Sequence, residues 1–299
     1  MQHFPAVSHT IAATASVPSH LIIYSASMKK KQLLLVSDIV GYGKVGALAM
    51  LPVLSYMGVP FYALPTMLVS NPFEYDKFAT SETTSYISDV LPVWRQLGFG
   101  FDAIATGIIA SESQARLVSA YCREQAENGT RVYVDPVMGD EGQLYNGITP
   151  DRIECMREMV AVAHLIYPNI TEACYLTGTA YRQEGYSTEE TYTIIDRLRS
   201  IGTRSVLITS VIVDGHPAVA GYNDENGNYF VLPFTEIPVH FPGTGDIFSA
   251  VLLGHLLDGK PLEESTRKAI DTMYRLIDAN KDNADKNSGI AVERYLSLI

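Results

Sequence analysis

Residues 103–135 read AIATGIIASESQARLVSAYCREQAENGTRVYVD, and this stretch decides the fold class. It starts and ends with short, mainly apolar runs, Ala103–Thr106 and Val132–Asp135, which are typical of strands buried on both faces of a sheet. Between them, Glu112–Glu127 has the pattern of an amphipathic helix and stops near Gly129, as a helix C-cap would. A strand, a helix and a second strand in this order predict a parallel βαβ unit.

The same alternation runs through the rest of the chain. Four further apolar runs predict strands, at Leu33–Ser37, Pro60–Leu64, Leu165–Tyr167 and Ser205–Thr209. Helices are predicted at Val45–Met57 and Ser81–Leu97, after Thr149-Pro150, and from the capping box Ser187–Glu190 to Gly202. Near the C-terminus the pattern predicts a hairpin of Pro217–Gly221 and Asn228–Leu232, then helices at about 245–258, 261–280 and 290–298.

These elements predict an α/β fold with a mainly parallel central sheet. No change in composition divides the chain, so we expect a single domain over residues 28–299. Residues 1–27 are rich in Ser, Thr, Ala and His without a helical or strand period, and we expect a disordered extension there.

The composition of the chain excludes several classes of protein. With 299 residues, 47% of them hydrophobic and 18% charged, the chain can bury a large core, which excludes disorder. A net charge of −11 disfavours nucleic acid as a partner. The chain contains no run of 18 apolar residues, so no membrane span is predicted. Three cysteines without a CxxC pair fit reduced core residues, so we expect a cytoplasmic protein.

The segment Gly243-Thr244-Gly245-Asp246 opens an apolar helix and has the composition of an anion site. Backbone N–H groups in the first turn of a helix have no partner within the helix, and the helix dipole adds to their positive potential. Asp246 can take a proton from a hydroxyl while these amides hold a transferring phosphoryl group. The segment therefore predicts phosphoryl transfer, although Asp246 as a plain helix cap stays open.

A second acidic segment, Asp135-Pro-Val-Met-Gly-Asp140, directly follows a predicted strand, and Glu172 follows the next one. Hard oxygen ligands of this kind suit Mg²⁺, which binds through one or two carboxylates plus phosphate. The chain has no Walker sequence, and the glycines of Gly41–Gly46 have the wrong spacing for a dinucleotide fingerprint. We therefore expect phosphoryl transfer without a P-loop.

Four segments in chain order resemble the pyridoxal/pyridoxamine kinases of the ribokinase-like superfamily. They are Ser37–Gly43 (SDIVGYG), Asp135–Asp140 (DPVMGD), Pro168–Ala173 (PNITEA) and Gly243–Asp246 (GTGD). The resemblance covers essentially Met28 to the C-terminus. The aspartate of the last segment resembles the residue that pyridoxal kinases carry at this position, whereas hydroxymethylpyrimidine kinases typically carry cysteine there. The resemblance implies a three-layer α/β/α domain, ATP and Mg²⁺ as cofactors, a small vitamin B6 alcohol as substrate and a homodimer.

The resemblance also implies roles for individual residues. Asp246 would deprotonate the 5′-hydroxyl of the substrate, and Gly243, Thr244 and Gly245 would form the anion hole. Metal and nucleotide positions would be Asp135, Asp140 and Glu172 for Mg²⁺, directly or through water, with Asn169, Thr209, Ser210 and Tyr145 near the nucleotide and its phosphates. Substrate positions would be Ser37, Thr106 and Phe73.

Two positions depart from the family pattern. After the second strand such kinases commonly carry a His-Thr pair, where this chain has Pro72-Phe73, and an aromatic residue commonly follows Thr106-Gly107, where this chain has Ile108. Pyridoxal would then be held differently, by Phe73 or Tyr75, or the acceptor would be another hydroxymethyl heterocycle such as hydroxymethylpyrimidine. A binding protein for a vitamer or nucleotide, without turnover, is a third interpretation.

Overall fold

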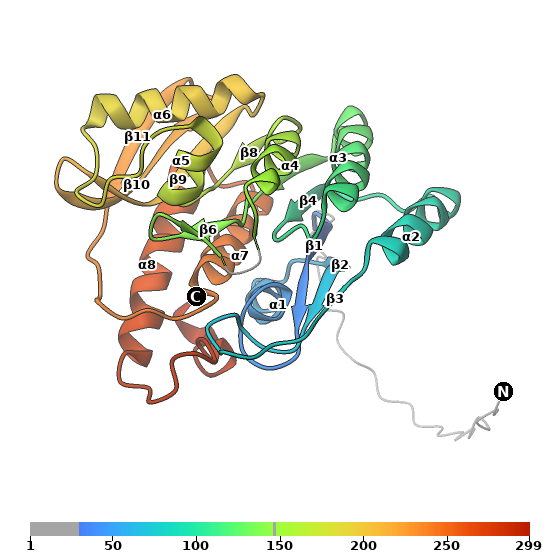
Figure 1. Cartoon of the computed structure of the whole chain (residues 1–299), viewed down its shortest axis with the longest axis horizontal. Coiled ribbons are helices and arrows are strands. Elements are labelled where there is room, and N and C mark those ends of the chain that lie inside the picture. The colour runs from blue at the N-terminus through green and yellow to red at the C-terminus, as the bar shows by residue number, and fades with distance from the viewer. Residues whose placement is uncertain (1–29, 146–147) are drawn as a thin grey trace, which may run out of the picture.

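The computed structural model describes residues 30–145 and 148–299. Its centre is a nine-stranded sheet in the order β11-β10-β9-β8-β5-β4-β1-β2-β3 (Figure 1). The six strands from β9 to β2 run parallel, and antiparallel strands lie at both edges. The strands of this sheet are β1 (Leu33–Val40), β2 (Phe61–Val69), β3 (Thr80–Glu82), β4 (Ala103–Thr106), β5 (Arg131–Val134), β8 (Leu165–Ile166), β9 (Ser205–Val213), β10 (His216–Asn223) and β11 (Asn228–Pro233). A separate small hairpin consists of β6 (Gly139–Asp140) and β7 (Gln143–Leu144).

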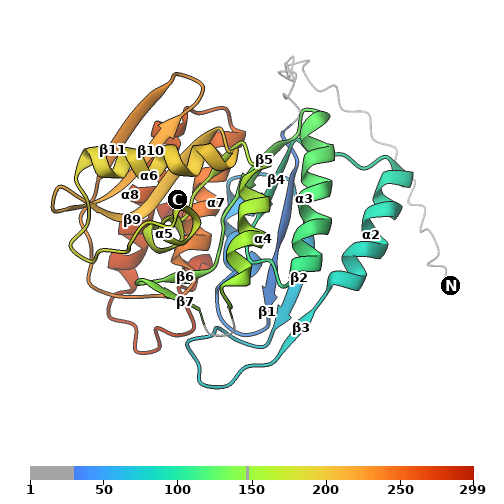
Figure 2. The ribbon, with the colours of Figure 1, turned by 45° about the horizontal axis from the view of Figure 1, so that its top comes forward.

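Helices cover both faces of the sheet, so the predicted three-layer α/β/α arrangement is confirmed. One face carries a layer that lies in front of the sheet in Figure 2: α2 (Thr84–Leu97), α3 (Glu112–Glu127), α4 (Asp151–Val160), α5 (Ile170–Thr177) and α6 (Thr188–Ile201). The other face carries α1 (Ala47–Tyr56), α7 (Thr244–Leu257) and α8 (Leu262–Asn280).

Strand β1 shows how the sequence feeds both cores. Leu34 and Val36 enter the core beneath α2 to α6, while Leu33 and Leu35 enter the core beneath α1, α7 and α8. All four are at most 1% exposed, because a central parallel strand has helices on both sides. An unbroken apolar run, without polar alternation, is the pattern that such a strand requires.

The structure corrects two expected elements and adds one helix. The helix predicted from Ser81 begins at Thr84, because Thr80–Glu82 pair with β2 as an antiparallel edge strand. The helix predicted over 290–298 consists of two 3₁₀ turns, η1 (Val292–Arg294) and η2 (Leu296–Leu298), because so short a stretch makes a marginal α-helix and its apolar residues pack against the α1, α7 and α8 core instead. Helix α5 was not predicted.

The expected extension over residues 1–27 lies outside the described residues. Cys122, Cys155 and Cys174 are free and buried in helices, as predicted for core residues. Within the part of the chain that the structure describes, no helix has the length and apolar character that crossing a membrane requires.

Candidate active site

The candidate site lies at the edge of the sheet where the parallel strands end. Four acidic side chains from different elements gather there: Asp38 from β1, Asp135 after β5, Glu172 from α5 and Asp246 from α7. Their negative charges act on one another, because Asp38 raises the pKa of Asp246, and both Glu172 and Asp246 raise the pKa of Asp135. The fold therefore brings these four acidic side chains together at one edge of the sheet.

The first turn of α7 has the geometry of an open anion site. Gly243 takes a left-handed conformation (φ 80°), and a Cβ there would lie 2.0 Å from the carbonyl oxygen of Lys44, so only glycine fits. No side chain caps the helix, and the hydroxyl of Thr244 turns back to donate to the Phe241 carbonyl at 3.1 Å. A Cβ at Gly245 would meet nothing within 4 Å. The amides of this turn therefore face space that a phosphate group can occupy.

Asp246 is held by a residue from the other end of the chain. The backbone N–H of Gly46 donates to its Oδ2 at 2.8 Å. Burial, followed by the charge of Asp38, raises the pKa of Asp246 to about 7, and the Gly46 hydrogen bond opposes this shift. A carboxyl group with a pKa near the working pH is suited to act as a general base.

Glu172 and Asn169 form the capping box of α5. The carboxylate of Glu172 accepts from the backbone N–H groups of Met138 and Asn169, both at 2.9 Å. The side chain of Asn169 accepts from the Glu172 N–H and donates to the Gly139 carbonyl at 2.7 Å. Both side chains are thus committed to the protein, and they fix the loop after β5 against α5. Burial nevertheless raises the pKa of Glu172 to about 8.

Asp135 is the acidic group best suited to a cation. Burial and the charges of Glu172 and Asp246 raise its pKa well above the usual range, while a hydrogen bond with Ser249 opposes the shift. Among the described residues no group of three or more His, Cys, Asp or Glu is arranged to hold a metal. The carboxylates therefore fit a Mg²⁺ ion that one or two of them bind, with water and phosphate oxygens as its other ligands.

The predicted neighbours of this cluster are Asp140 and Tyr145. Asp140 Oδ1 accepts from the Glu141 N–H at 2.8 Å. Burial raises the pKa of Asp140, and this hydrogen bond and the nearby His240 oppose only part of the shift. Burial raises the pKa of Tyr145, as do the charges of Glu172, Asp140, Asp135 and Glu74.

Thr209 and Ser210 lie in β9, where the strand leaves the regular conformation. Ser210 has a positive φ of 53°, which is uncommon for a residue other than glycine, and its side chain is exposed. The Thr209 N–H donates to the Pro168 carbonyl at 2.9 Å, directly before Asn169. The pair therefore lies beside the α5 capping box, and its expected role at the nucleotide stays a prediction.

The predicted substrate positions lie in different surroundings. The Ser37 hydroxyl donates to Asp38 Oδ1 at 3.1 Å, and the hydroxyl of Thr106 is buried without a partner in the structure. Phe73 packs edge-on against Phe78, with ring centroids 4.8 Å apart, which favours loop packing over substrate contact. Ile108 is buried and has no aromatic ring to offer.

Sequence reasoning set aside the glycine segment Gly41–Gly46, yet this segment builds the site. Gly46 holds Asp246, and the Lys44 carbonyl packs against Gly243. The Lys44 N–H donates to the Ser288 carbonyl at 2.8 Å, and the Lys44 ammonium pairs with Glu293. Three glycines within six residues signalled a close backbone approach, although not the partner that they approach.

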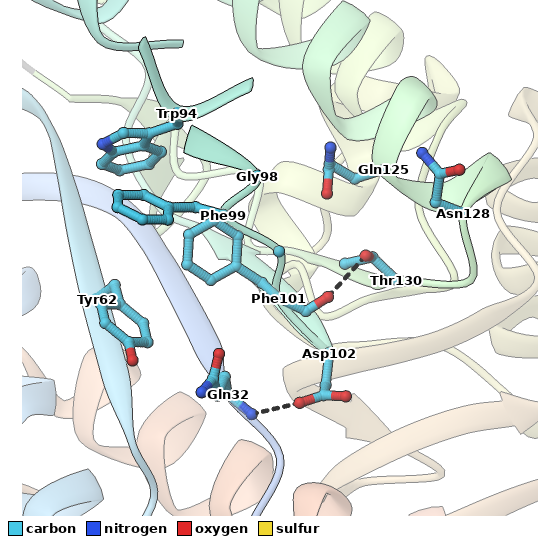
Figure 3. Close-up of a pocket in the computed structure, with 11 residues that line it drawn as sticks. Gln32, Tyr62, Trp94, Gly98, Phe99, Phe101, Asp102, Gln125, Asn128 and Thr130 are labelled. Carbon is cyan, nitrogen blue, oxygen red and sulfur yellow. Dashed lines mark hydrogen bonds between the residues drawn. The ribbon is translucent and has the colours of Figure 1, made fainter. Parts of the chain in front are cut away.

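A hollow of about 720 Å³ lies elsewhere, at the edge of the sheet where β1, β2, β4 and β5 begin (Figure 3). Aromatic rings form one wall, with Trp94 and Tyr62 both beside Phe101. Among the described residues that line it, Asp102 is the only acidic one, and its carboxylate accepts from the Gln32 N–H at 2.7 Å. This hollow lacks the paired carboxylates and open helix N-terminus of the candidate site.

Comparisons with known proteins agree with this fold. A family model described as phosphomethylpyrimidine kinase matches residues 79–291. Pyridoxal kinase of Dictyostelium discoideum is 26% identical over 274 residues, which cover 86% of this chain and 89% of that protein. The crystal structure of a candidate phosphomethylpyrimidine kinase from Bacteroides thetaiotaomicron, in a form with pyridoxal, is 32% identical with a TM-score of 0.83 and covers 90% of this chain and 95% of that one. The crystal structure of pyridoxal kinase from Lactobacillus plantarum is 28% identical with a TM-score of 0.80 and covers 89% and 95%.

The three-layer fold, with an acidic cluster beside the open N-terminus of α7, defines the class as a ribokinase-like kinase, as the sequence predicted. The chain belongs to the phosphomethylpyrimidine kinase family.

Proposed function

We propose that this protein transfers the γ-phosphoryl group of ATP to the 5′-hydroxyl of pyridoxal, pyridoxine or pyridoxamine. The observation that carries the proposal is the position of Asp246, whose carboxylate lies in the uncapped first turn of α7 and is held by the Gly46 N–H. A new bond forms between the hydroxyl oxygen of the substrate and the γ-phosphorus. With a base and a phosphate-binding turn on one helix, the base can act on the hydroxyl while the turn holds the phosphoryl group. The named relatives, pyridoxal kinases, support the same reaction.

In this mechanism Asp246 accepts the proton of the 5′-hydroxyl while the hydroxyl oxygen attacks the γ-phosphorus. The leaving group is ADP. The amides of Thr244 and Gly245, together with the dipole of α7, stabilise the negative charge on the transferring group. Gly243 is required because any side chain there would strike the Lys44 carbonyl and displace the turn.

We assign Mg²⁺ to the acidic cluster, where it would neutralise charge on the phosphates. Asp135 is the candidate direct ligand, because its buried carboxylate is repelled by Glu172 and Asp246. Glu172 would act through water, since both of its oxygens already accept backbone hydrogen bonds. Asp140 and Tyr145 would lie at the edge of the metal and phosphate region.

The nucleotide is assigned to the β8–β9 side of the site. Thr209 and Ser210 lie at an irregular point of β9, and Asn169 holds the adjacent loop in place. On the other side, the candidates for the vitamer are Thr106 at the end of β4 and Ser37, which follows the last β1 residue paired with β4. We do not assign Phe73 a contact with the ring, because it packs against Phe78.

A second candidate acceptor is hydroxymethylpyrimidine. The family model that matches this chain is described by a pyrimidine substrate, and Ile108 leaves the substrate side without the aromatic residue expected of pyridoxal kinases. The presence of Asp246 and of pyridoxal in a structure 32% identical to this chain supports the vitamer.

Oligomeric state and cellular location are also proposals. We propose a homodimer, and large exposed apolar side chains support it: nine of the eleven among the described residues lie between Tyr42 and Phe99. Sedimentation of the purified protein measures this state directly. A cytoplasmic location is supported by three buried free cysteines.

The reaction is tested by incubating the purified protein with Mg-ATP and, separately, each of the three vitamers and hydroxymethylpyrimidine. Mass spectrometry then detects the monophosphate. We expect phosphorylation of at least one vitamer at a higher kcat/KM than the pyrimidine. Turnover of the pyrimidine alone would establish the second candidate, and ATP binding without any product would contradict both.

A further inference from the structure

The carbonyl of Lys44 lies between two glycines that are far apart in the sequence. A Cβ at Gly243, in the turn proposed to bind phosphate, would lie 2.0 Å from the Lys44 oxygen, and a Cβ at Gly289 would lie 2.8 Å from it. A Cβ at Gly289 would also lie 2.9 Å from the carbonyl oxygen of Pro242, the residue before that turn. Gly289 thus packs against both partners in the contact between the loop after β1 and the start of α7.

Two further contacts join Lys44 to the segment 288–293, which follows α8. The N–H of Lys44 donates to the Ser288 carbonyl at 2.8 Å, and the Lys44 ammonium pairs with the Glu293 carboxylate. Both side chains of this ion pair are partly exposed, so the pair alone contributes little to stability. Together with the backbone hydrogen bond, however, it fixes the main chain and the side chain of Lys44 to the same segment.

The segment 288–293 is itself fixed by the core. Ile290 and Val292 are fully buried, and they belong to the core beneath α1, α7 and α8. The N–H of Gly289 donates to the Lys286 carbonyl at 3.0 Å. Because a close-packed core resists displacement, this segment is a rigid support for Lys44.

Lys44 connects this support to the two groups that the proposed mechanism requires. Its carbonyl lies against Gly243, where the phosphate turn begins, and two residues later the Gly46 N–H donates to Asp246 Oδ2 at 2.8 Å. A displacement of Lys44 would therefore move the proposed base and the phosphate turn relative to each other. A misplacement of reacting groups by about 1 Å can lower a reaction rate by about 100-fold.

We propose that the segment 288–293 positions the active site: through Lys44, its residues Gly289 and Glu293 hold the loop after β1 against the first turn of α7. The inference rests on the proposed function. Gly289 and Glu293 are positioning residues, because they act through Lys44 and not on the substrate. The candidates for the vitamer, Ser37 and Thr106, belong to the sheet strands β1 and β4, so the segment should affect the chemical step more than vitamer binding.

The test inserts one methyl group into this contact. In Gly289→Ala the new Cβ would strike the carbonyls of Lys44 and Pro242, so we expect kcat for pyridoxine to fall about 10- to 100-fold while KM changes by less than about threefold. The matched control is Gly259→Ala, just after α7, where φ is also positive (87° against 77°) but the Cβ would meet nothing within 4 Å. This control should keep normal kcat. Rates are compared at a temperature at which both variants are fully folded.

The pH profile gives a readout that a loss of stability alone would not change. The hydrogen bond from Gly46 lowers the pKa of Asp246. Its weakening in Gly289→Ala should therefore move the acidic limb of the kcat/KM profile above the expected midpoint of about 7, whereas Gly259→Ala should keep that midpoint. A fall in kcat without this shift would overturn the proposal, because the loss would then come from the fold and not from the position of the base.

A second pair of variants adds no atom to the contact. Glu293→Gln removes the charge that pairs with Lys44, and we expect kcat to fall about two- to fivefold, because only the weaker tie is lost. Glu264→Gln removes an ion pair of similar exposure, with Lys260, and should leave kcat unchanged. If Gly289→Ala does not fold, equal kcat in these two variants would overturn the proposal. Failure of the proposed function is distinguishable, because the wild-type protein would then phosphorylate no vitamer.

Discussion

The backbone N–H of Gly46 donates a hydrogen bond to Oδ2 of Asp246, across 200 residues of sequence and over 2.8 Å. This contact joins the loop after β1 to the first turn of α7, and it fixes the proposed base beside the amides that would bind phosphate. Gly46 contributes its N–H, and its missing side chain leaves room for Asp38. One glycine thus lies against two carboxylates.

Asp246→Asn should strongly lower activity while stabilising the fold. The loss of a general base lowers kcat by about 10²–10⁴-fold. The folded state holds a proton on Asp246 up to a pKa of about 7, whereas the unfolded chain releases it near 4, so the ionised carboxylate destabilises the fold at pH 8. Asparagine removes this charge and can still accept from Gly46. We expect a higher Tm than wild type at pH 8 and no difference near pH 4. A lower Tm at pH 8 would contradict the assigned charge.

The pH profile should show the same group in the active protein. Asp246 must be ionised to accept a proton, so kcat/KM should fall as the pH drops below about 7, the pKa of the free protein. The measurement is the initial rate at low vitamer concentration between pH 5 and 9, with ATP and Mg²⁺ saturating. A profile that stays flat down to pH 5 would exclude Asp246 as the base.

Gly46→Ala should damage both stability and catalysis. Gly46 has φ 58° and ψ −145°, a conformation that other residues avoid, and the added Cβ would lie 2.3 Å from Asp38 Oδ1. We expect a loss of about 1–3 kcal/mol in unfolding free energy from the strain, measured by urea denaturation.

The control for this variant is Gly98→Ala, at a left-handed position (φ 69°, ψ 29°) where no atom lies within 4 Å of the new Cβ. It should lose less stability than Gly46→Ala, because left-handed backbone is more accessible to alanine than the conformation of Gly46, and it should keep normal kcat. Equal kinetic losses in the two variants would show that the contact with Asp38 and Asp246 is irrelevant to catalysis.

Asp135→Asn should weaken the response to Mg²⁺. We expect the Mg²⁺ concentration for half-maximal activity to rise at least tenfold at fixed ATP, because a charged ligand is lost. The wild-type protein with a non-hydrolysable ATP analogue should also gain Tm on addition of Mg²⁺, and the variant should gain less. Equal gains in both proteins would remove Asp135 from the metal site.

Local features of the sequence were sufficient for most of the fold. The run Leu33–Val36 is buried on both faces, as its unbroken apolar character predicted, and the Ser187 capping box opens α6. The missed helix α5 had the same signal, because Asn169 and Glu172 form a capping box three residues apart. These two residues were interpreted only as metal and nucleotide positions, although their spacing also predicts the start of a helix.

Contacts between distant segments could not be predicted from such patterns. Nothing near Gly46 in the sequence points to Asp246, and nothing near Lys44 points to Gly243, since these contacts depend on how α1 and α7 pack on the same face of the sheet. The edge strand Thr80–Glu82 was missed for a related reason: it exists through its pairing with β2.

The most direct test of the account is phosphoryl transfer by the wild-type and Asp246→Asn proteins side by side, with Mg-ATP and pyridoxine, followed by mass spectrometry of the product. We predict that the wild-type protein forms pyridoxine 5′-phosphate and that Asp246→Asn, although folded, forms it at least a hundred times more slowly. Equal rates in the two proteins would contradict the assignment of the base. No vitamer phosphate from the wild-type protein would contradict the proposed function itself.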